Sequence, residues 1–167
     1  MHHFSTSSFA TLSVKADRQE IWRVVVPKVA YSCDFLMHGL LAFSALHLAS
    51  LKPENAFTYT EVAAMHQNIG LGSFRTALTN ITDENCNAVF AFSSLVVGYA
   101  LTLPIRNGNN TLPEPIDNAV ELFTLSLGVA EVLKPCSERV KNGSLAPLLL
   151  TGYFQTPLPT EKLVHLE

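Results

Sequence analysis

The stretch that decides the fold is FLMHGLLAFSALHLASL, residues Phe35–Leu51. It contains no Asp, Glu, Lys or Arg, and drawn as an α-helix it is apolar around its whole circumference. A helix with this pattern has to be buried on all sides, either in the core of a larger structure or in a membrane. We therefore expect other helices to pack around it, and the sequence on both sides is suited to supply them.

Short helices are expected before this stretch. Residues 1–14 predict a short helix in which apolar side chains alternate with serines and threonines. Asp17 followed by Glu20 forms a capping-box pattern that should open a second helix. Pro27 should end that helix, because proline lacks the amide hydrogen and clashes with the preceding turn.

A helical hairpin is expected next. Asp34 is a suitable N-cap for the charge-free helix, and the Lys52–Glu54 turn ends it. Residues 55–79 then predict a long helix, which Gly70 and Gly72 weaken by about 1 kcal/mol each and bend. The apolar residues expected on one side of this helix are Phe57, Val62, Ala63, Met65, Ile69, Phe74 and Leu78.

The rest of the chain continues the helical pattern. Thr82 should cap a helix that runs to about Leu103, followed by a loop over 106–115. An amphipathic helix is predicted over 116–133, and one more short helix over 140–150. No segment shows strand alternation. The predicted fold is all-α, with antiparallel helical hairpins packed as an irregular helical bundle.

Length and composition predict one domain with excess apolar surface. The 167 residues are 48% hydrophobic and only 15% charged, below the usual quarter for charged residues. We expect a helical domain over 1–151 and an irregular tail over 152–167. The apolar surplus indicates that something else covers part of the surface: missing protein, a partner subunit or a lipid.

Charge and cysteine content exclude two functions for this chain. The net charge of −3, without a basic run, argues against direct DNA binding. The three cysteines, Cys33, Cys86 and Cys136, are too far apart for a disulfide framework or a zinc cluster, so we interpret them as buried structural thiols. The uncharged run Ala88–Ile105 is interpreted as a core helix, and no membrane span is predicted.

No pattern in the sequence predicts an enzyme or a metal site. His38, His47 and His66 lack the HxxxH spacing of a metal-binding helix, and each is expected to bond a carbonyl or to lie at a polar edge. The alternatives are that these three histidines converge in the folded chain, or that a cysteine and a histidine form a nucleophile pair. The prediction is a protein that is not an enzyme and holds no cofactor or metal.

One polar contact is expected to fix a hairpin. Arg75, near the end of the long helix, is placed to reach Glu84 or Asn85 after the following turn. We interpret these three residues as structural. Contact between Arg75 and the polar group of a ligand is the alternative.

Several segments together carry a resemblance to a known family. After the charge-free stretch come, in order, His66-Gln67, Phe74–Leu78, Asn80–Cys86 and Ala91–Leu95. This ordered series resembles the regulatory domain of fungal transcription factors with a binuclear zinc cluster, in the branch concerned with the control of sterol uptake. It is strong to about Ala100 and fades after Pro147.

The resemblance implies a helical regulatory domain, or the N-terminal portion of one, in a fungal regulator of RNA polymerase II genes. It implies a nuclear location, with shuttling to the cytoplasm, and a hydrophobic ligand such as a sterol. Family domains are longer than this chain, so none of their ligand contacts can be carried over. From the apolar pattern, the candidate ligand-binding residues are Phe35, Met37, Leu41, His66, Phe90 and Phe92.

Two other interpretations remain open at this stage. The chain is alternatively an interaction module without a ligand, whose apolar surface contacts a second copy or a transcription co-regulator. It is alternatively a truncated family member that lacks the DNA-binding part. The six closely spaced cysteines that the family's zinc cluster requires are absent in this sequence.

Overall fold

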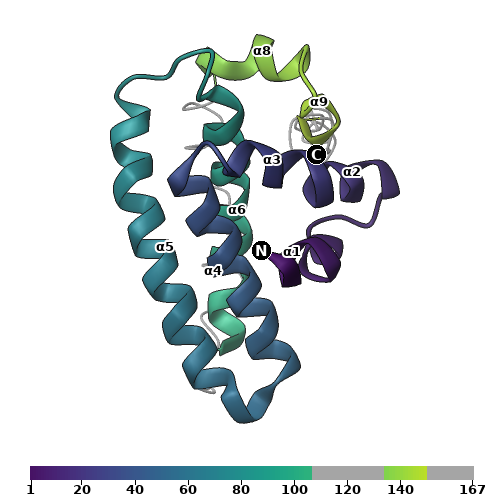
Figure 1. The fold of residues 1–167 in the computed structure, drawn as a ribbon, viewed down its shortest axis with the longest axis vertical. Coiled ribbons are helices and arrows are strands. Elements are labelled where there is room, and N and C mark those ends of the chain that lie inside the picture. The colour runs from purple at the N-terminus through teal and green to yellow at the C-terminus, as the bar shows by residue number, and fades with distance from the viewer. Residues whose placement is uncertain (107–133, 150–167) are drawn as a thin grey trace, which may run out of the picture.

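The computed structural model describes residues 1–106 and 134–149. All regular elements in these two ranges are helical, which confirms the all-α prediction (Figure 1). Three long helices form the body: α4 (Asp34–Leu51), α5 (Ala56–Leu78) and α6 (Cys86–Arg106). The short elements are α1 (His2–Thr6), η1 (Ser8–Leu12), α2 (Ala16–Glu20), η2 (Ile21–Val25), α3 (Val26–Ala30), η3 (Pro53–Asn55), η4 (Lys134–Cys136), α8 (Ser137–Lys141) and α9 (Ala146–Leu149).

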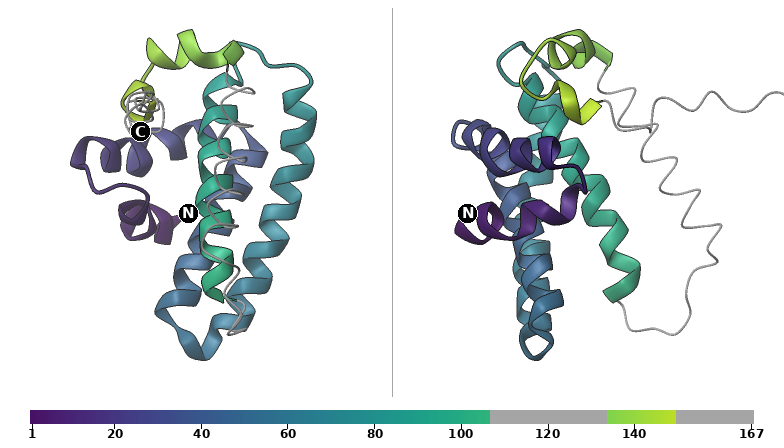
Figure 2. Two further views of the ribbon diagram at one scale, coloured as in Figure 1. Left: turned by 180° about the vertical axis from the view of Figure 1, so that it is seen from behind. Right: turned by 90° about the vertical axis from the view of Figure 1, so that its right-hand side faces the viewer.

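Helix α4 lies at the centre of this arrangement. It packs along α5 as an antiparallel hairpin, and α6, α3 and the N-terminal elements cover its other sides (Figures 1 and 2). Among the described residues, α4 is the one helix whose length and composition would suit a membrane span, yet 56% of its apolar window is buried inside the protein. The helices around it thus give α4 the apolar surroundings that its sequence requires.

The turn between the two helices of the hairpin follows the sequence prediction. Pro53 occupies the first turn of η3, where its missing amide hydrogen costs nothing. Helix α5 then begins at Ala56 and ends at Leu78, within one residue of the predicted bounds.

The N-terminal helix differs from its prediction in two ways. Asp17 and Glu20 form no capping box, because α2 begins at Ala16 and its N-cap makes no side-chain hydrogen bond. Pro27 does not end the helix either, since the helical path continues from α2 through η2 into α3. The η2 segment is a π-helical turn, in which the Val26 amide donates to the Ile21 carbonyl five residues back. This wider turn accommodates the proline ring that would clash in a regular α-helix.

The two predicted N-caps had different outcomes. Asp34 is the first residue of α4 and not its cap, which is Cys33. Thr82 does cap the turn before α6. Its Oγ1 accepts from the Asn85 amide at 3.4 Å, and the Thr82 amide donates to Asn85 Oδ1 at 2.8 Å. Asn85 thereby acts as the second half of a reciprocal capping pair.

The side of α5 expected to be buried is largely exposed. Among the predicted residues, Ala63 and Phe74 are buried, whereas Phe57 is 80% exposed and Met65 51%. Val62 and Ile69 are also exposed. The buried face is instead formed by Ala63, Gln67, Gly70 and Phe74.

Gly70 allows close packing of the hairpin. A Cβ atom at this position would lie 3.1 Å from the Phe35 carbonyl oxygen and 3.0 Å from the Phe92 ring. The glycine therefore has a reason beyond the helix bend that the sequence suggested. Gly72 has open space around it.

The C-terminal described segment closes one end of the bundle. The single helix predicted over 140–150 is wrong, because the chain forms two short helices, α8 and α9. Arg139 of α8 forms an ion pair with Asp83, before α6. Arg18 of α2 is buried, and its Nε donates to the Pro147 carbonyl at 3.0 Å. The loop predicted over 106–115 begins at a residue that belongs to α6, Arg106. The rest of that loop, the amphipathic helix predicted over 116–133 and the tail predicted over 152–167 lie outside the described residues.

Candidate functional site

A histidine pair joins the two helices of the central hairpin. His38 Nδ1 of α4 lies 2.8 Å from His66 Nδ1 of α5, and the ring centroids are 5.0 Å apart. At this distance one nitrogen donates its hydrogen and the other accepts, so the two rings need complementary tautomers. Both side chains are half-buried. The pair is a polar contact between the two helices of the hairpin.

A second histidine pair ties the N-terminal segment to α4. His47 Nδ1 lies 3.2 Å from His3 Nε2 and 3.1 Å from Ser8 Oγ. The two imidazole rings are stacked, with centroids 5.1 Å apart. Ser8 is fully buried, and this contact gives its hydroxyl a partner.

The surroundings of these pairs disfavour protonation. Burial lowers the pKa of His66, and the neighbouring His38 lowers it further. Burial likewise lowers the pKa of His3, followed by the effects of His47 and Lys52. A second proton on either pair would also leave two donors facing each other. His66 and His3 are therefore protonated only at a lower pH than an ordinary histidine.

This arrangement predicts that acid weakens the fold. The unfolded chain takes up protons near the ordinary histidine pKa of about 6.5, whereas folded His66 takes one up only at lower pH. The stabilisation is complete above pH 6.5 and is lost as the pH falls through that value towards the lowered pKa. We expect urea unfolding to show a falling free energy between pH 7.5 and 5.

Replacing His66 by glutamine should reduce this pH dependence. The dependence should not vanish in His66→Gln, because His3 contributes in the same direction. His2→Gln is the matched control, because His2 is exposed. Identical pH profiles for His66→Gln and the unaltered chain would contradict the role of the pair.

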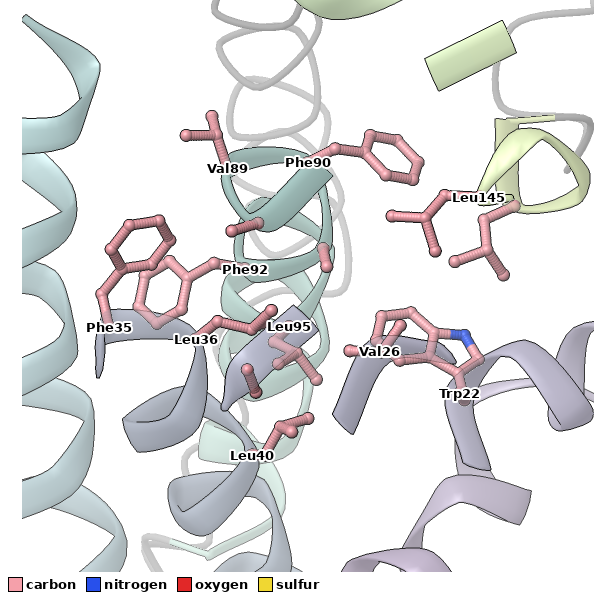
Figure 3. Packing of buried hydrophobic residues seen from close by; sticks show 14 of the residues in the cluster. Trp22, Val26, Phe35, Leu36, Leu40, Val89, Phe90, Phe92, Leu95 and Leu145 are labelled. Carbon is pink, nitrogen blue, oxygen red and sulfur yellow. The ribbon is translucent and has the colours of Figure 1, made fainter. Parts of the chain in front are cut away.

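An aromatic cluster fills the space where the three long helices meet. The Phe35 ring contacts Phe74 and Phe92 edge-on at centroid distances of 5.6 and 5.5 Å, and Phe74 lies 4.7 Å from Phe92. Phe35 and Phe92 are drawn side by side in Figure 3. Two candidate ligand-binding residues thus lie together, and the protein's own rings occupy the space between them.

The other candidate residues do not join this cluster. Phe90 is buried and points from α6 towards Leu145, on the side away from Phe35 (Figure 3). Met37 and Leu41 are half-buried on α4, and His66 pairs with His38. The six candidates therefore occupy at least three different environments.

Arg75, Glu84 and Asn85, which were expected to fix a hairpin together, do not form one contact. Asn85 is structural as predicted: besides pairing with Thr82, its Nδ2 donates to the Asn80 carbonyl at 3.0 Å. Arg75 and Glu84 are both exposed. Among the described residues, the structure shows no hydrogen bond or ion pair between Arg75 and either Glu84 or Asn85.

Two buried thiols meet between α6 and η4. Cys86 and Cys136 share a hydrogen bond, and burial raises the pKa of Cys86. Burial, with the neighbouring Cys86, raises the pKa of Cys136 to about 11. Both groups therefore stay protonated near neutral pH, in keeping with structural thiols. Cys33 is only half-buried.

Within the described ranges, no group of three or more His, Cys, Asp or Glu side chains is placed to hold a metal ion. The two histidines of α4 have different partners and do not converge on one point: His38 lies against His66, and His47 lies against His3 and Ser8. The described residues thus form a helical unit built around α4, in which residues 35–51 carry no charged side chain.

Comparison with known proteins identifies the family. The model of the fungal specific transcription factor domain matches residues 1–138. The chain belongs to this family, whose members are generally not enzymes. It is 31% identical over 146 residues to Sterol uptake control protein 2 of Saccharomyces cerevisiae, and 34% identical over 96 residues to the Candida albicans protein of the same name. These alignments cover 84% and 56% of this chain.

A third relative is matched over more of its own length. The chain is 25% identical over 167 residues to a Zn(2)-C6 fungal-type transcription factor of Aspergillus fumigatus, covering 96% of this chain and 43% of that protein. The chain spans only 15% and 13% of the two sterol uptake control proteins. No solved structure matches it significantly.

Proposed function

We propose that this chain is part of a regulatory domain that adjusts transcription by RNA polymerase II in response to a hydrophobic, sterol-like molecule. The observation that carries the proposal is the 31% identity to Sterol uptake control protein 2 over 84% of the chain. The family match over residues 1–138 gives the regulatory role. Fungal transcription factors are generally nuclear, and we assign this domain to the nucleus, with shuttling to the cytoplasm as part of the proposal.

The composition of the hairpin supports an apolar ligand. Met37 and Leu41 are half-buried on a helix whose stretch from Phe35 to Leu51 has no charged residue. The His38–His66 pair joins the two helices of the hairpin, and His38 directly follows Met37 in the sequence. A sterol carries one hydroxyl on a rigid apolar body, so one polar contact beside an apolar surface matches its chemistry.

Regulation by such a ligand requires two states of the domain. The ligand shifts the balance between them only by its difference in affinity for the two. A ligand that inserted between α4 and α5 would have to break the His38–His66 contact or bind to it. We propose that this contact distinguishes the ligand-free state from the bound state.

The test is a titration of the 167-residue chain with a fluorescent sterol, following energy transfer from its single tryptophan, Trp22. Trp22 is buried in the core, so its emission also reports that the chain is folded. We expect saturable transfer that unlabelled sterol competes away. Leu41→Gln should weaken it, whereas Phe57→Ser, at an 80% exposed position, should not. A folded chain without saturable transfer would overturn ligand binding by these helices.

A second candidate function is a ligand-free interaction module. The exposed apolar side chains of α5 favour it, since exposed patches of this kind mark interaction sites. In this function the domain would bind a second copy or a transcription co-regulator and would need no pocket. Sedimentation of the isolated chain tests this candidate: a chain that stays monomeric over a wide concentration range would count against association with a second copy.

A further inference from the structure

Helix α5 exposes a regular stripe of uncharged residues, of which Val62, Met65 and Ile69 carry large apolar side chains. Six of its exposed residues follow one another at intervals of four, three, four, three and four positions. This is the spacing of the two core positions in the heptad repeat of a coiled coil. The six residues, called the α5 seam below, are Thr58, Val62, Met65, Ile69, Gly72 and Thr76.

The seam lies opposite the face that α5 uses inside the protein. The buried residues Ala63, Gln67, Gly70 and Phe74 pack towards the rest of the structure, whereas Val62, Met65 and Ile69 are 37%, 51% and 45% exposed. Figures 1 and 2 show α5 at the edge of the molecule, with α4 on its inner side. Within residues 1–106 and 134–149, the stripe is therefore not part of the internal packing.

The residue types suit packing against another helix. Val62, Ile69 and Thr76, which are all β-branched, occupy one of the two core positions of this repeat. A Cβ atom added at Gly72 would meet no other atom within 4 Å. The missing side chain of this glycine leaves room for a bulky residue from the facing helix.

The charges specify which helix would fit. Glu61 and Arg75 are the acidic and the basic residue of α5, and both are exposed. They stand at equivalent heptad positions on the same flank of the seam, two repeats apart. When two copies of α5 pack antiparallel with Met65 opposite Ile69 of the partner and Val62 opposite its Gly72, these flanks face each other. Each Glu61 then meets the Arg75 of the other copy.

We propose that the α5 seam is a homodimer interface, in which α5 packs antiparallel against α5 of a second copy of this chain. The two copies are related by a two-fold axis, so that each contact occurs twice. The core layers are Val62 with Gly72 and Met65 with Ile69, and the flanks are two Glu61–Arg75 ion pairs. This interface is formed from exposed residues and does not depend on a hydrophobic ligand.

Charge exchange in the full 167-residue chain tests both the interface and its direction. Sedimentation equilibrium should show a species with twice the mass of one chain. Glu61→Arg or Arg75→Glu alone places like charges opposite each other twice, and each should raise the dimer Kd by about tenfold or more. The double variant restores opposite charges and should return the Kd to within about threefold of the original.

The controls exchange charges away from the seam. Lys28→Glu and Glu54→Arg alter exposed residues outside α5 and should leave the Kd unchanged. Circular dichroism of every variant checks that the fold is retained, which is expected because all four positions are exposed. Ile69→Asp, which places a charge in the seam itself, should abolish the dimer.

Three outcomes would overturn the proposal. The first is a chain that stays monomeric at high concentration. In that case another part of a longer protein, or a different partner, would cover the α5 seam. The second is a dimer unaffected by Ile69→Asp. The third is a dimer that both single exchanges weaken and the double variant does not restore, because a parallel pair would not bring Glu61 to Arg75.

Discussion

Replacing Phe92 by alanine is expected to lower the free energy of unfolding by about 3–5 kcal/mol, the usual cost of removing a fully buried phenylalanine ring. Phe92 has no exposed surface and contacts Phe35 and Phe74. Its ring also fills the space left by Gly39 and Gly70. The cavity left by the substitution cannot collapse easily, because two of its walls are helix backbone.

Urea unfolding followed by circular dichroism measures this effect. The matched control is Phe57→Ala, the same chemical change at a position that is 80% exposed. It should alter the free energy of unfolding by no more than about 0.5 kcal/mol. The central role assigned to the aromatic cluster would be wrong if the two variants lost similar stability.

Gly39→Ala is expected to destabilise the chain, against the ordinary helix preference. Alanine is favoured over glycine by about 1 kcal/mol in the interior of a helix. At Gly39, however, the new Cβ would lie 2.8 Å from Cδ2 of Phe92 and 3.2 Å from Cδ1 of Leu95. The Phe92 ring is held by two other rings and cannot swing aside. We expect a net loss of about 1–2 kcal/mol, within the range for overpacked cores.

Gly72→Ala is the control of opposite sign. A Cβ there meets nothing within 4 Å, so only helix propensity acts and stability should rise by about 0.5–1 kcal/mol. The comparison is made by urea unfolding at low chain concentration, where association through the α5 seam does not contribute. Equal effects at the two glycines would show that close helix packing does not set their roles.

The histidine pairs show what the sequence could not reveal. His38 and His66 are 28 positions apart, and His3 and His47 are 44 apart, so no local spacing links them. The sequence favoured a carbonyl partner or a polar edge for each histidine. The alternative, that His38, His47 and His66 converge, holds only for His38 and His66. Only the docking of α1 and α5 against α4 brings the rings together.

The failed prediction for α5 has a different physical cause. Ala63, Gln67, Gly70 and Phe74 are mostly small or polar, and they form the buried face because α4 and α5 approach each other closely. A hydrophobicity pattern favours the larger Phe57, Val62, Met65 and Ile69, which lie outside. When a helix has apolar residues on two faces, its sequence alone does not show which face packs against the rest of the same chain.

The sequence by itself determined that this protein is all-α, that residues 35–51 form its buried centre, and that its family is that of fungal transcription factor domains. The helix bounds at Ala56 and Leu78, and the capping residue Thr82, followed from proline, caps and periodicity, which act over a few residues. The tertiary structure alone decided which face of α5 is buried, which histidines pair, and why Gly39 and Gly70 differ from Gly72. These features depend on distances between helices far apart in sequence, and those distances follow from packing of the whole bundle.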